Sequence, residues 1–242
     1  MFSKNINVDD ILVPEVIKRD YKGYEFSFDM DYIRSLDCVS FFNICTIREI
    51  DQFVLKIADL VKKEISLSTF KEFPRDVFFE KYEKVKNLSK QSPCKDVFNK
   101  IENRIDEIFL SMCNDNIPIG FCHGDLTLSN ILIRKNDKNI FLIDFLDSFI
   151  ESPIIDMVKI RQDTKYMWTV SLYRGSIDKN KFSILMNHMD RMFEKEFMKY
   201  DFYNKFYTPF QIMNFLRILP YIKTKDQAKI CENALIDITG AV

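Results

Sequence analysis

Glycine is scarce in this sequence of 242 residues, which contains only five, and Gly23 is the only one before residue 120. A glycine-rich loop that cradles phosphates with its backbone is therefore excluded from the first half of the chain. Histidine is scarcer still, with two residues, which argues against a zinc site or a histidine-based metallohydrolase centre. The six cysteines include no C-x-x-C pair, so we expect reduced thiols rather than a disulfide framework.

Long apolar runs and an excess of one charge are also missing. No segment approaches the roughly 20 apolar residues that a membrane span needs, and the first ten residues lack the apolar core of a signal peptide. The 35 basic and 36 acidic residues leave a formal net charge of -1, which provides no whole-chain field for a polyanion, although a local basic patch is compatible with it. We therefore expect a cytoplasmic protein that binds neither nucleic acid nor membranes.

The sequence is rich in apolar residues. Hydrophobic residues make up 47% of it, and 23 residues are phenylalanine, which is enough for a substantial core. Apolar and polar residues alternate strictly over residues 24–32, which predicts a half-buried strand, and residues 11–20 predict a weaker strand that pairs with it. A second hairpin is predicted at residues 130–145. Apolar spacings of three and four predict helices at residues 46–65, 74–89, 92–112, 154–163, 178–199, 208–219 and 224–238. The predicted fold class is α+β.

Residues that favour helix starts support four of these helices. Thr46 with Glu49, and Thr224 with Gln227, have the spacing of a capping box, in which each residue bonds the other's backbone. Ser92-Pro93 and Thr208-Pro209 place a proline at the first helical position.

One short segment, residues 121–149, concentrates the side chains that handle protons and metals. It contains His123-Gly124-Asp125, then Asn130, and then Asp144 at the end of the apolar run "FLID". A loop carboxylate such as Asp125 can accept a proton from an attacking hydroxyl. The oxygens of Asn130 and Asp144 suit Mg²⁺, and a hairpin brings these two residues to the same end of paired strands. A base, an asparagine and an aspartate are the components of phosphoryl transfer. Read alone, His123 is more typical of a hydrogen-bonded core residue, and an aspartate after a strand is more typical of a turn.

The segments "HGDLTLSNILI" and "FLIDF" resemble the aminoglycoside phosphotransferase and choline kinase family, small-molecule kinases with a protein-kinase-like fold. The resemblance implies that Asp125 is the catalytic base, that His123 braces its loop, and that Asn130 and Asp144 hold Mg²⁺. The segment "SPIIDMVKIRQD" is similar to the family's segment after the metal-binding aspartate. It implies that Asp156 is a structural residue that ties down the catalytic loop.

The front of the chain resembles the same family with a much shortened N-terminal lobe. The segment "MDYIRSLD" is similar to the hinge between the two lobes, which implies that Met30, Asp31, Tyr32 and Ile33 bind the nucleotide, ATP or GTP. No lysine ahead of this hinge has the strand setting of the family's phosphate-binding lysine. We therefore expect a remnant N-lobe hairpin and hinge at residues 1–35 and a helical C-lobe at residues 36–242.

The resemblance predicts a phosphotransferase that moves the γ-phosphate of ATP or GTP to a hydroxyl of a sugar-like or amino-alcohol acceptor. The alternative is a pseudokinase-like binding module, because the phosphate clamp of the N-lobe is missing. With a reduced N-lobe we also expect a second copy of the chain or another partner to cover the exposed side of the helical lobe.

Acceptor residues are predicted only from their place after the metal-binding strand. The candidates are Asp147, Asp163, Tyr166, Trp168 and Arg217. Tyr166 and Trp168 are slightly more typical of ordinary core or surface aromatic residues. Arg217 lies among apolar residues, where a salt bridge to a nearby acid is the favoured interpretation.

Overall fold

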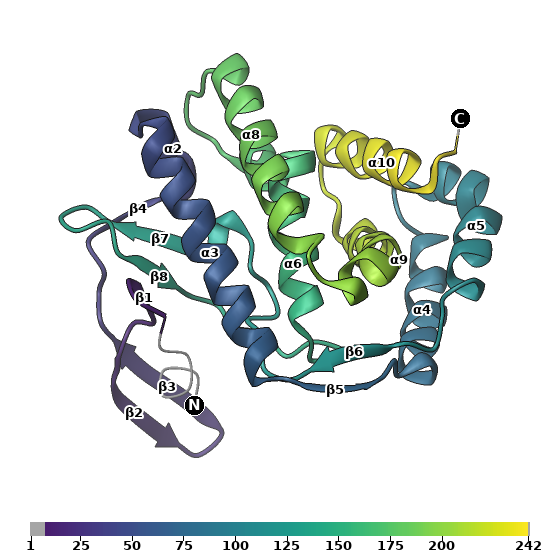
Figure 1. Ribbon diagram of the computed structural model, residues 1–242, viewed down its shortest axis with the longest axis horizontal. Coiled ribbons are helices and arrows are strands. Elements are labelled where there is room, and N and C mark those ends of the chain that lie inside the picture. The colour runs from purple at the N-terminus through teal and green to yellow at the C-terminus, as the bar shows by residue number, and fades with distance from the viewer. Residues whose placement is uncertain (1–7, 242) are drawn as a thin grey trace.

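The computed structural model describes residues 8–241 and shows a small sheet on one side of a larger group of helices (Figure 1). The sheet has four strands in the order β1-β8-β7-β4, with β1 parallel to β8 and the other pairs antiparallel. Two further pairs, β2 with β3 and β5 with β6, are separate antiparallel ribbons. The strands are β1 (Ile11–Leu12), β2 (Val16–Lys22), β3 (Glu25–Met30), β4 (Ser35–Asp37), β5 (Thr69–Glu72), β6 (Asn116–Ile119), β7 (Ile131–Arg134) and β8 (Ile140–Leu142). The fold is α+β, as the sequence predicts.

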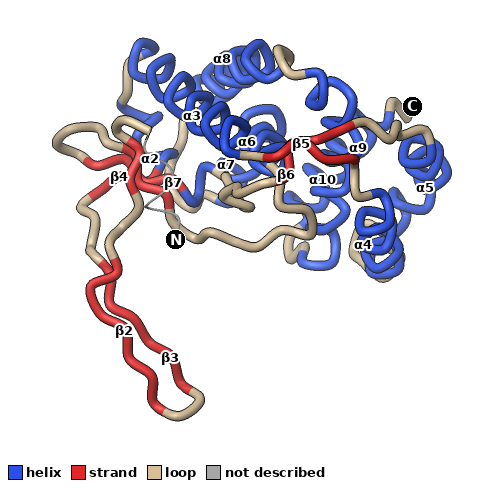
Figure 2. The backbone as a smooth tube through the Cα atoms, turned by 60° about the horizontal axis from the view of Figure 1, so that its bottom comes forward, coloured by secondary structure: helices blue, strands red, loops and turns tan. Residues whose placement is uncertain are grey.

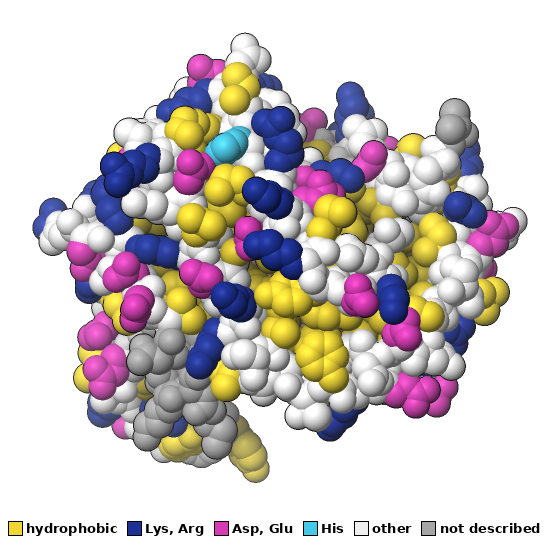
Figure 3. Space-filling view, in the orientation of Figure 1, with side chains coloured by type: hydrophobic (Ala, Val, Ile, Leu, Met, Phe, Trp, Pro, Cys, Tyr) yellow, Lys and Arg dark blue, Asp and Glu magenta, His cyan; other side chains and the backbone are white. Residues whose placement is uncertain are grey.

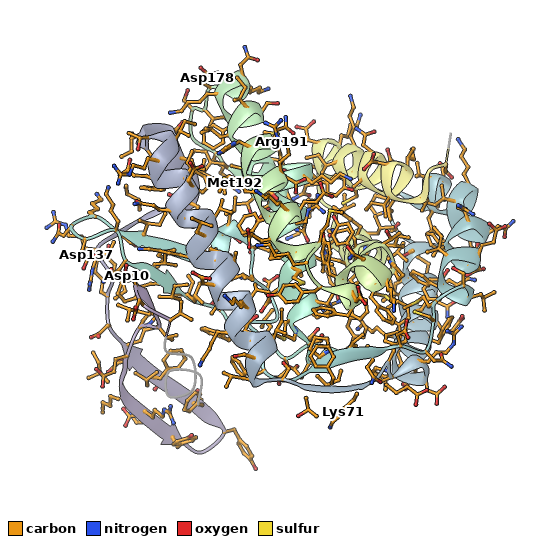
Figure 4. The ribbon with its side chains drawn as sticks, in the orientation of Figure 1. Asp10, Lys71, Asp137, Asp178, Arg191 and Met192 are labelled. Atoms are coloured by element: carbon orange, nitrogen blue, oxygen red, sulfur yellow. The ribbon has the colours of Figure 1, made fainter. Side chains whose placement is uncertain are left out.

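Both predicted hairpins are confirmed. Strands β7 and β8 pair within the predicted range 130–145, and Asp137 lies in the turn between them, where it accepts hydrogen bonds from Arg134 (Figure 4). Strands β2 and β3 pair around Gly23, whose φ of +64° is readily adopted by glycine.

The burial predicted for the first hairpin is wrong. Every residue of β3 is exposed, and Figure 2 shows β2 and β3 as an arm that extends away from the rest of the chain. Its alternating apolar side chains therefore lie in solvent, with Phe26 and Phe28 about half exposed and their rings 5.9 Å apart. The expectation that another copy or a partner covers this side stays a prediction.

The helices account for most of the remaining chain. They are α2 (Cys38–Ile44), α3 (Ile47–Leu67), α4 (Arg75–Ser89), α5 (Lys95–Leu110), α6 (Pro153–Tyr166), α7 (Trp168–Leu172), α8 (Lys179–Phe197), α9 (Asp201–Ile218) and α10 (Lys225–Thr239), with short 3-10 turns η1 (Leu128–Asn130) and η2 (Leu219–Tyr221). The capping boxes predicted at Thr46 and Thr224 are confirmed by reciprocal hydrogen bonds with Glu49 and Gln227.

Two predicted helix starts are wrong. Helix α5 begins at Lys95 rather than at Pro93, with Cys94 as the residue before its first turn and no side-chain cap. The hydroxyl of Ser92 donates to the carbonyl of Ser89 and accepts from the amide of Cys94, so it belongs to the turn that precedes the helix. Helix α9 begins at Asp201, so Pro209 lies inside it. A proline inside a helix removes one backbone hydrogen bond. Here helix residues on both sides of Pro209 are buried, and their packing offsets that loss.

Helix α6 runs through the middle of the helical group and is buried along most of its length, packed against α8 and α9 (Figure 1). Arg161 of α6 ties these helices together, since its guanidinium makes two hydrogen bonds to Asp190 of α8 and one to the hydroxyl of Tyr203 of α9. A buried charge must be paired in this way to be tolerated.

The surface fits the balanced composition. Figure 3 shows basic and acidic side chains interspersed over the visible face. All six cysteines carry free thiols. Within residues 8–241, no helix has both the length and the apolar character required to cross a bilayer.

Candidate active site

The segment that carries Asp125 leaves β6 and makes a close approach to the segment that carries Asp144. At the point of closest approach Gly124 has a φ of +83°, and a Cβ atom there would lie 1.9 Å from the carbonyl oxygen of Leu146. The amide of Leu146 donates to the carbonyl of His123 at 3.1 Å, which holds the two segments together. Only glycine fits this position, so Gly124 is required by the backbone geometry of the site.

Asp156, near the start of α6, holds the loop that carries His123, Gly124 and Asp125. Its carboxylate accepts hydrogen bonds from the amides of His123 at 2.5 Å and Gly124 at 2.9 Å. Asp156 is fully buried, and burial raises its pKa to about 7. Beside it lies Glu64 of α3, also buried, whose pKa is raised well above its usual range by burial and by the charge of Asp156. The sequence gives no sign of Glu64, which stands on the apolar face of an otherwise ordinary amphipathic helix.

A second buried carboxylate, Asp163, supports the other end of the loop. It accepts hydrogen bonds from the amides of Leu128 at 2.6 Å and Thr169 at 2.7 Å, and burial raises its pKa to about 6. Asp163 was predicted as an acceptor residue. Its full burial and its two backbone partners instead make it a support for the loop.

His123 is fully buried within the loop that carries Asp125. Its ring lies 4.2 Å from that of Phe145, and its Nδ1 accepts a hydrogen bond from the amide of Asp125 at 3.3 Å. Burial lowers the pKa of His123 to about 4, even though Asp125 and Asp144 both act to raise it. The imidazole is therefore neutral near pH 7 and suited to bracing Asp125 rather than to carrying a proton.

The carboxylate of Asp125 is held by one charged and one neutral group. Its Oδ1 lies 3.0 Å from Nζ of Lys159, and its Oδ2 accepts a hydrogen bond of 2.9 Å from Nδ2 of Asn130. The side chain of Asp125 is 24% exposed, so its carboxylate remains accessible from solvent. Lys159 was missed from the sequence. Its position could have been inferred from Asp156. Lys159 lies three residues after Asp156, on the same face of the helix, and Asp156 is predicted to hold the same loop.

The residues predicted to hold Mg²⁺ suit that ion in type and arrangement. Asn130 uses its amide nitrogen on Asp125, which leaves its Oδ1 as the donor atom for a cation. The amide of Ile143 donates to the carbonyl of Asn130 at 3.0 Å, so the next residue, the exposed Asp144, begins beside Asn130. No group of three or more His, Cys, Asp or Glu side chains converges as a metal site in the described part of the chain, and the assignment of Mg²⁺ to Asn130 and Asp144 stays a prediction.

The predicted hinge connects the β2–β3 arm to β4. Asp31 donates its amide to the carbonyl of Glu15, and the carbonyl of Ile33 accepts from the hydroxyl of Ser35. Met30 ends β3 and is 41% exposed, and Tyr32 is almost fully exposed. The carbonyl of Asp31 and the amide of Ile33 make no backbone hydrogen bond to another described residue. That this segment binds the nucleotide stays a prediction.

The remaining acceptor candidates are scattered. Tyr166 donates to Asp237 of α10 at 3.0 Å, and Trp168 packs against the core, which agrees with the packing interpretation of both. Asp147 is exposed in the loop after Asp144. Arg217 forms no salt bridge with any acid of the described chain, so that prediction is wrong; its guanidinium lies 5.5 Å from the ring centre of Phe149.

Comparison with known proteins finds similarity to kinases of small molecules. A model of the choline/ethanolamine kinase family matches residues 32–206. The fold is similar to glucosamine kinase solved with glucosamine, ADP and inorganic phosphate, with a TM-score of 0.66 and 15% identity over 95% of this chain and 64% of that one. Another glucosamine kinase structure, crystal form B, has a TM-score of 0.65 and 16% identity over 88% of this chain and 61% of that one.

A third similar structure is spectinomycin phosphotransferase in complex with ADP and spectinomycin, with a TM-score of 0.51 and 12% identity over 97% of this chain and 78% of that one. Identities this low show a shared fold, and the chain spans less than two thirds of the length of the glucosamine kinases. A search of curated proteins finds no match to the sequence.

Proposed function

The chain belongs to the choline/ethanolamine kinase family, and from that premise we propose that it transfers the γ-phosphate of ATP or GTP to a hydroxyl group of a small molecule. The observation that supports this proposal most directly is the setting of Asp125. Lys159 and Asn130 hold both oxygens of its carboxylate, and the carboxylate is still open to solvent. Its loop is fixed from below by Asp156.

In this proposal Asp125 accepts the proton of the acceptor hydroxyl as that oxygen attacks the γ-phosphorus. Because Lys159 and Asn130 hold the carboxylate in one orientation, little reorganisation is needed when the acceptor arrives. Asn130 and Asp144 would hold Mg²⁺, which when bound neutralises charge on the nucleotide phosphates. The segment from Met30 to Ile33 would bind the base, through the carbonyl of Asp31 and the amide of Ile33.

The test is substitution of the proposed base. We expect Asp125→Asn to lower phosphoryl transfer by about 10²–10⁴-fold, the usual contribution of a general base, while Mg²⁺-nucleotide affinity stays nearly unchanged. Transfer would be measured by ADP or GDP release with a panel of acceptors, and binding by thermal shift with ATP and GTP, with and without Mg²⁺. The matched control is Asp59→Asn, which removes an exposed carboxylate from α3.

Two results would overturn the proposal. Transfer that survives in Asp125→Asn would remove the role of Asp125. If neither ATP nor GTP changes the melting temperature of the wild-type protein, with or without Mg²⁺, the kinase assignment is wrong. Nucleotide binding without transfer to any acceptor would be the behaviour of a pseudokinase-like binding module, the alternative that the sequence leaves open.

A further inference from the structure

A pocket of about 260 Å³ opens beside Asp125, between α4, α6, the end of α9 and the turn η2. Three of its lining side chains are cations, Lys81 from α4, Lys159 from α6 and Arg217 from α9, and none of its lining side chains is acidic. Val85 of α4 and the half-exposed Leu88 supply apolar wall. A pocket with this composition is suited to an anion.

Two of the three cations form no salt bridge within the described part of the chain. Lys159 is paired with Asp125 at 3.0 Å, but Lys81 and Arg217 form no salt bridge and no side-chain hydrogen bond with the described part of the chain. Burial lowers the pKa of each. For Lys81 the charge of Arg217 lowers the pKa further, whereas for Arg217 the charge of Asp125 acts to raise it. Two partly buried like charges in one pocket are unfavourable in the free protein. A bound anion would remove this unfavourable interaction.

The pocket lies away from the elements that are proposed to hold the nucleotide. The elements proposed to hold the nucleotide are the β3–β4 connection and the β7–β8 hairpin, on the left of Figure 1, whereas α4 and the end of α9 lie on the right. Lys159 spans the two regions, since it lines the pocket and contacts the proposed base directly. A molecule held in the pocket by Lys81 and Arg217 would therefore contact the same lysine that holds Asp125.

We propose that this pocket is the acceptor site and that it takes a small hydroxyl compound carrying a phosphate or carboxylate group, with Lys81 and Arg217 binding the anion. The inference rests on the proposed function. In the reaction, the acceptor oxygen forms a bond to the γ-phosphorus, the bond from that phosphorus to the bridging oxygen breaks, and the nucleoside diphosphate leaves. The hydroxyl proton passes to Asp125. A cationic acceptor would meet three like charges in the same space, so the pocket selects against amines.

The experiment compares sugars that differ in charge. Glucose 6-phosphate, glucuronate, glucose and glucosamine would each be titrated calorimetrically into the full chain, with and without Mg²⁺-ADP. We expect binding of glucose 6-phosphate or glucuronate with a Kd below about 1 mM, at least tenfold tighter than glucose or glucosamine. The stronger of the two anions identifies phosphate or carboxylate as the recognised group.

Single substitutions assign the binding to this pocket. We expect Arg217→Gln and Lys81→Gln each to weaken binding of the anionic sugar by about tenfold or more, because each removes a charged hydrogen-bond donor. Lys84→Gln on the same helix, and Arg191→Gln on α8, which Figure 4 places away from α4, should leave the affinity unchanged. Circular dichroism of each variant confirms that it is folded.

The outcomes separate this inference from the proposed function. Equal or tighter binding of glucosamine, binding of none of the four sugars, or displacement of the anionic sugar by ADP would overturn the inference. Transfer to glucosamine that depends on Asp125 would then still support the proposed function. Anion binding that depends on Lys81 and Arg217, without transfer from ATP or GTP, would support the anion site and count against the proposed function.

Discussion

Replacing Gly124 by alanine tests whether the contact between the two site segments is as tight as the structure shows. The new Cβ would lie 1.9 Å from the Leu146 carbonyl oxygen, whereas real Cβ atoms essentially never come within 3.0 Å of such an atom. The two segments must therefore separate by about 1 Å. They carry Asp125 on one side and Asp144 on the other, so the separation pulls the proposed base and the proposed metal ligand apart.

The expected magnitudes follow from two contributions. An alanine at positive φ costs about 1–2 kcal/mol, and forcing extra volume into a packed contact costs about 1–3 kcal/mol, so Gly124→Ala should lower the free energy of unfolding by about 2–5 kcal/mol. A displacement of about 1 Å at reacting groups can lower the transfer rate by about 10²-fold. Urea unfolding measures the first effect, and nucleoside diphosphate release measures the second.

The chain provides a control with the same backbone strain and no clash. Gly23 has a φ of +64°, and a Cβ there would have nothing within 4 Å. Gly23→Ala should therefore lower stability by about 1–2 kcal/mol and leave transfer unchanged. If Gly124→Ala and Gly23→Ala lose the same stability, the close approach to Leu146 is not the reason for the glycine.

Three further predictions concern the supports of the site. Because burial raises the pKa values of Asp156 and Glu64, these two carboxyl groups bind more protons in the folded protein than in the unfolded chain between about pH 4 and 7. Their contribution to stability should therefore fall as pH rises through that range, while the lowered pKa of His123 acts in the opposite direction. Glu64→Gln should remove part of the contribution of the carboxyl groups in urea unfolding, and an unchanged slope would contradict this prediction. Arg161→Met leaves the buried carboxylate of Asp190 unpaired and should cost about 3–5 kcal/mol in the same assay, whereas a loss below about 1 kcal/mol would show that the pair is dispensable. Asp144→Asn should raise the Mg²⁺ concentration needed for ATP binding by about tenfold or more, and an unchanged Mg²⁺ titration would remove Asp144 from the proposed metal site.

The parts of the fold that the sequence predicts well are those specified by local chemistry. The capping box at Thr46 lies where helix α3 begins, and the polar turn between two apolar runs becomes the β7–β8 hairpin. Local reasoning fails where tertiary packing decides the outcome. Thr208-Pro209 is typical of a helix start, yet buried contacts on both sides extend α9 through Pro209. The alternation around Phe26 predicts a buried face, but that prediction depends on a neighbour that local spacing does not supply.

The same distinction holds for the candidate site. Asp125, Asn130 and Asp144 share one segment and are recognisable from their order, and the structure brings their backbones together. Lys159 and Glu64 reach the loop only because α6 and α3 pack beneath it, so their positions follow from helix packing rather than from any motif. A residue of this kind is found by asking which side chains share a helix face with a known support of the loop.

The order of strands in the small sheet joins the beginning of the chain to its middle. The β7–β8 hairpin has β1 bonded along one outer edge and β4 along the other, so the chain flanking the exposed arm borders both sides of the hairpin. A force that pulls on the arm therefore acts on β1 and β4, the two strands bonded to the hairpin whose ends carry Asn130 and Asp144. Removing the first thirty-seven residues would strip both borders at once, and the bared hairpin would offer its amides to any strand of another molecule.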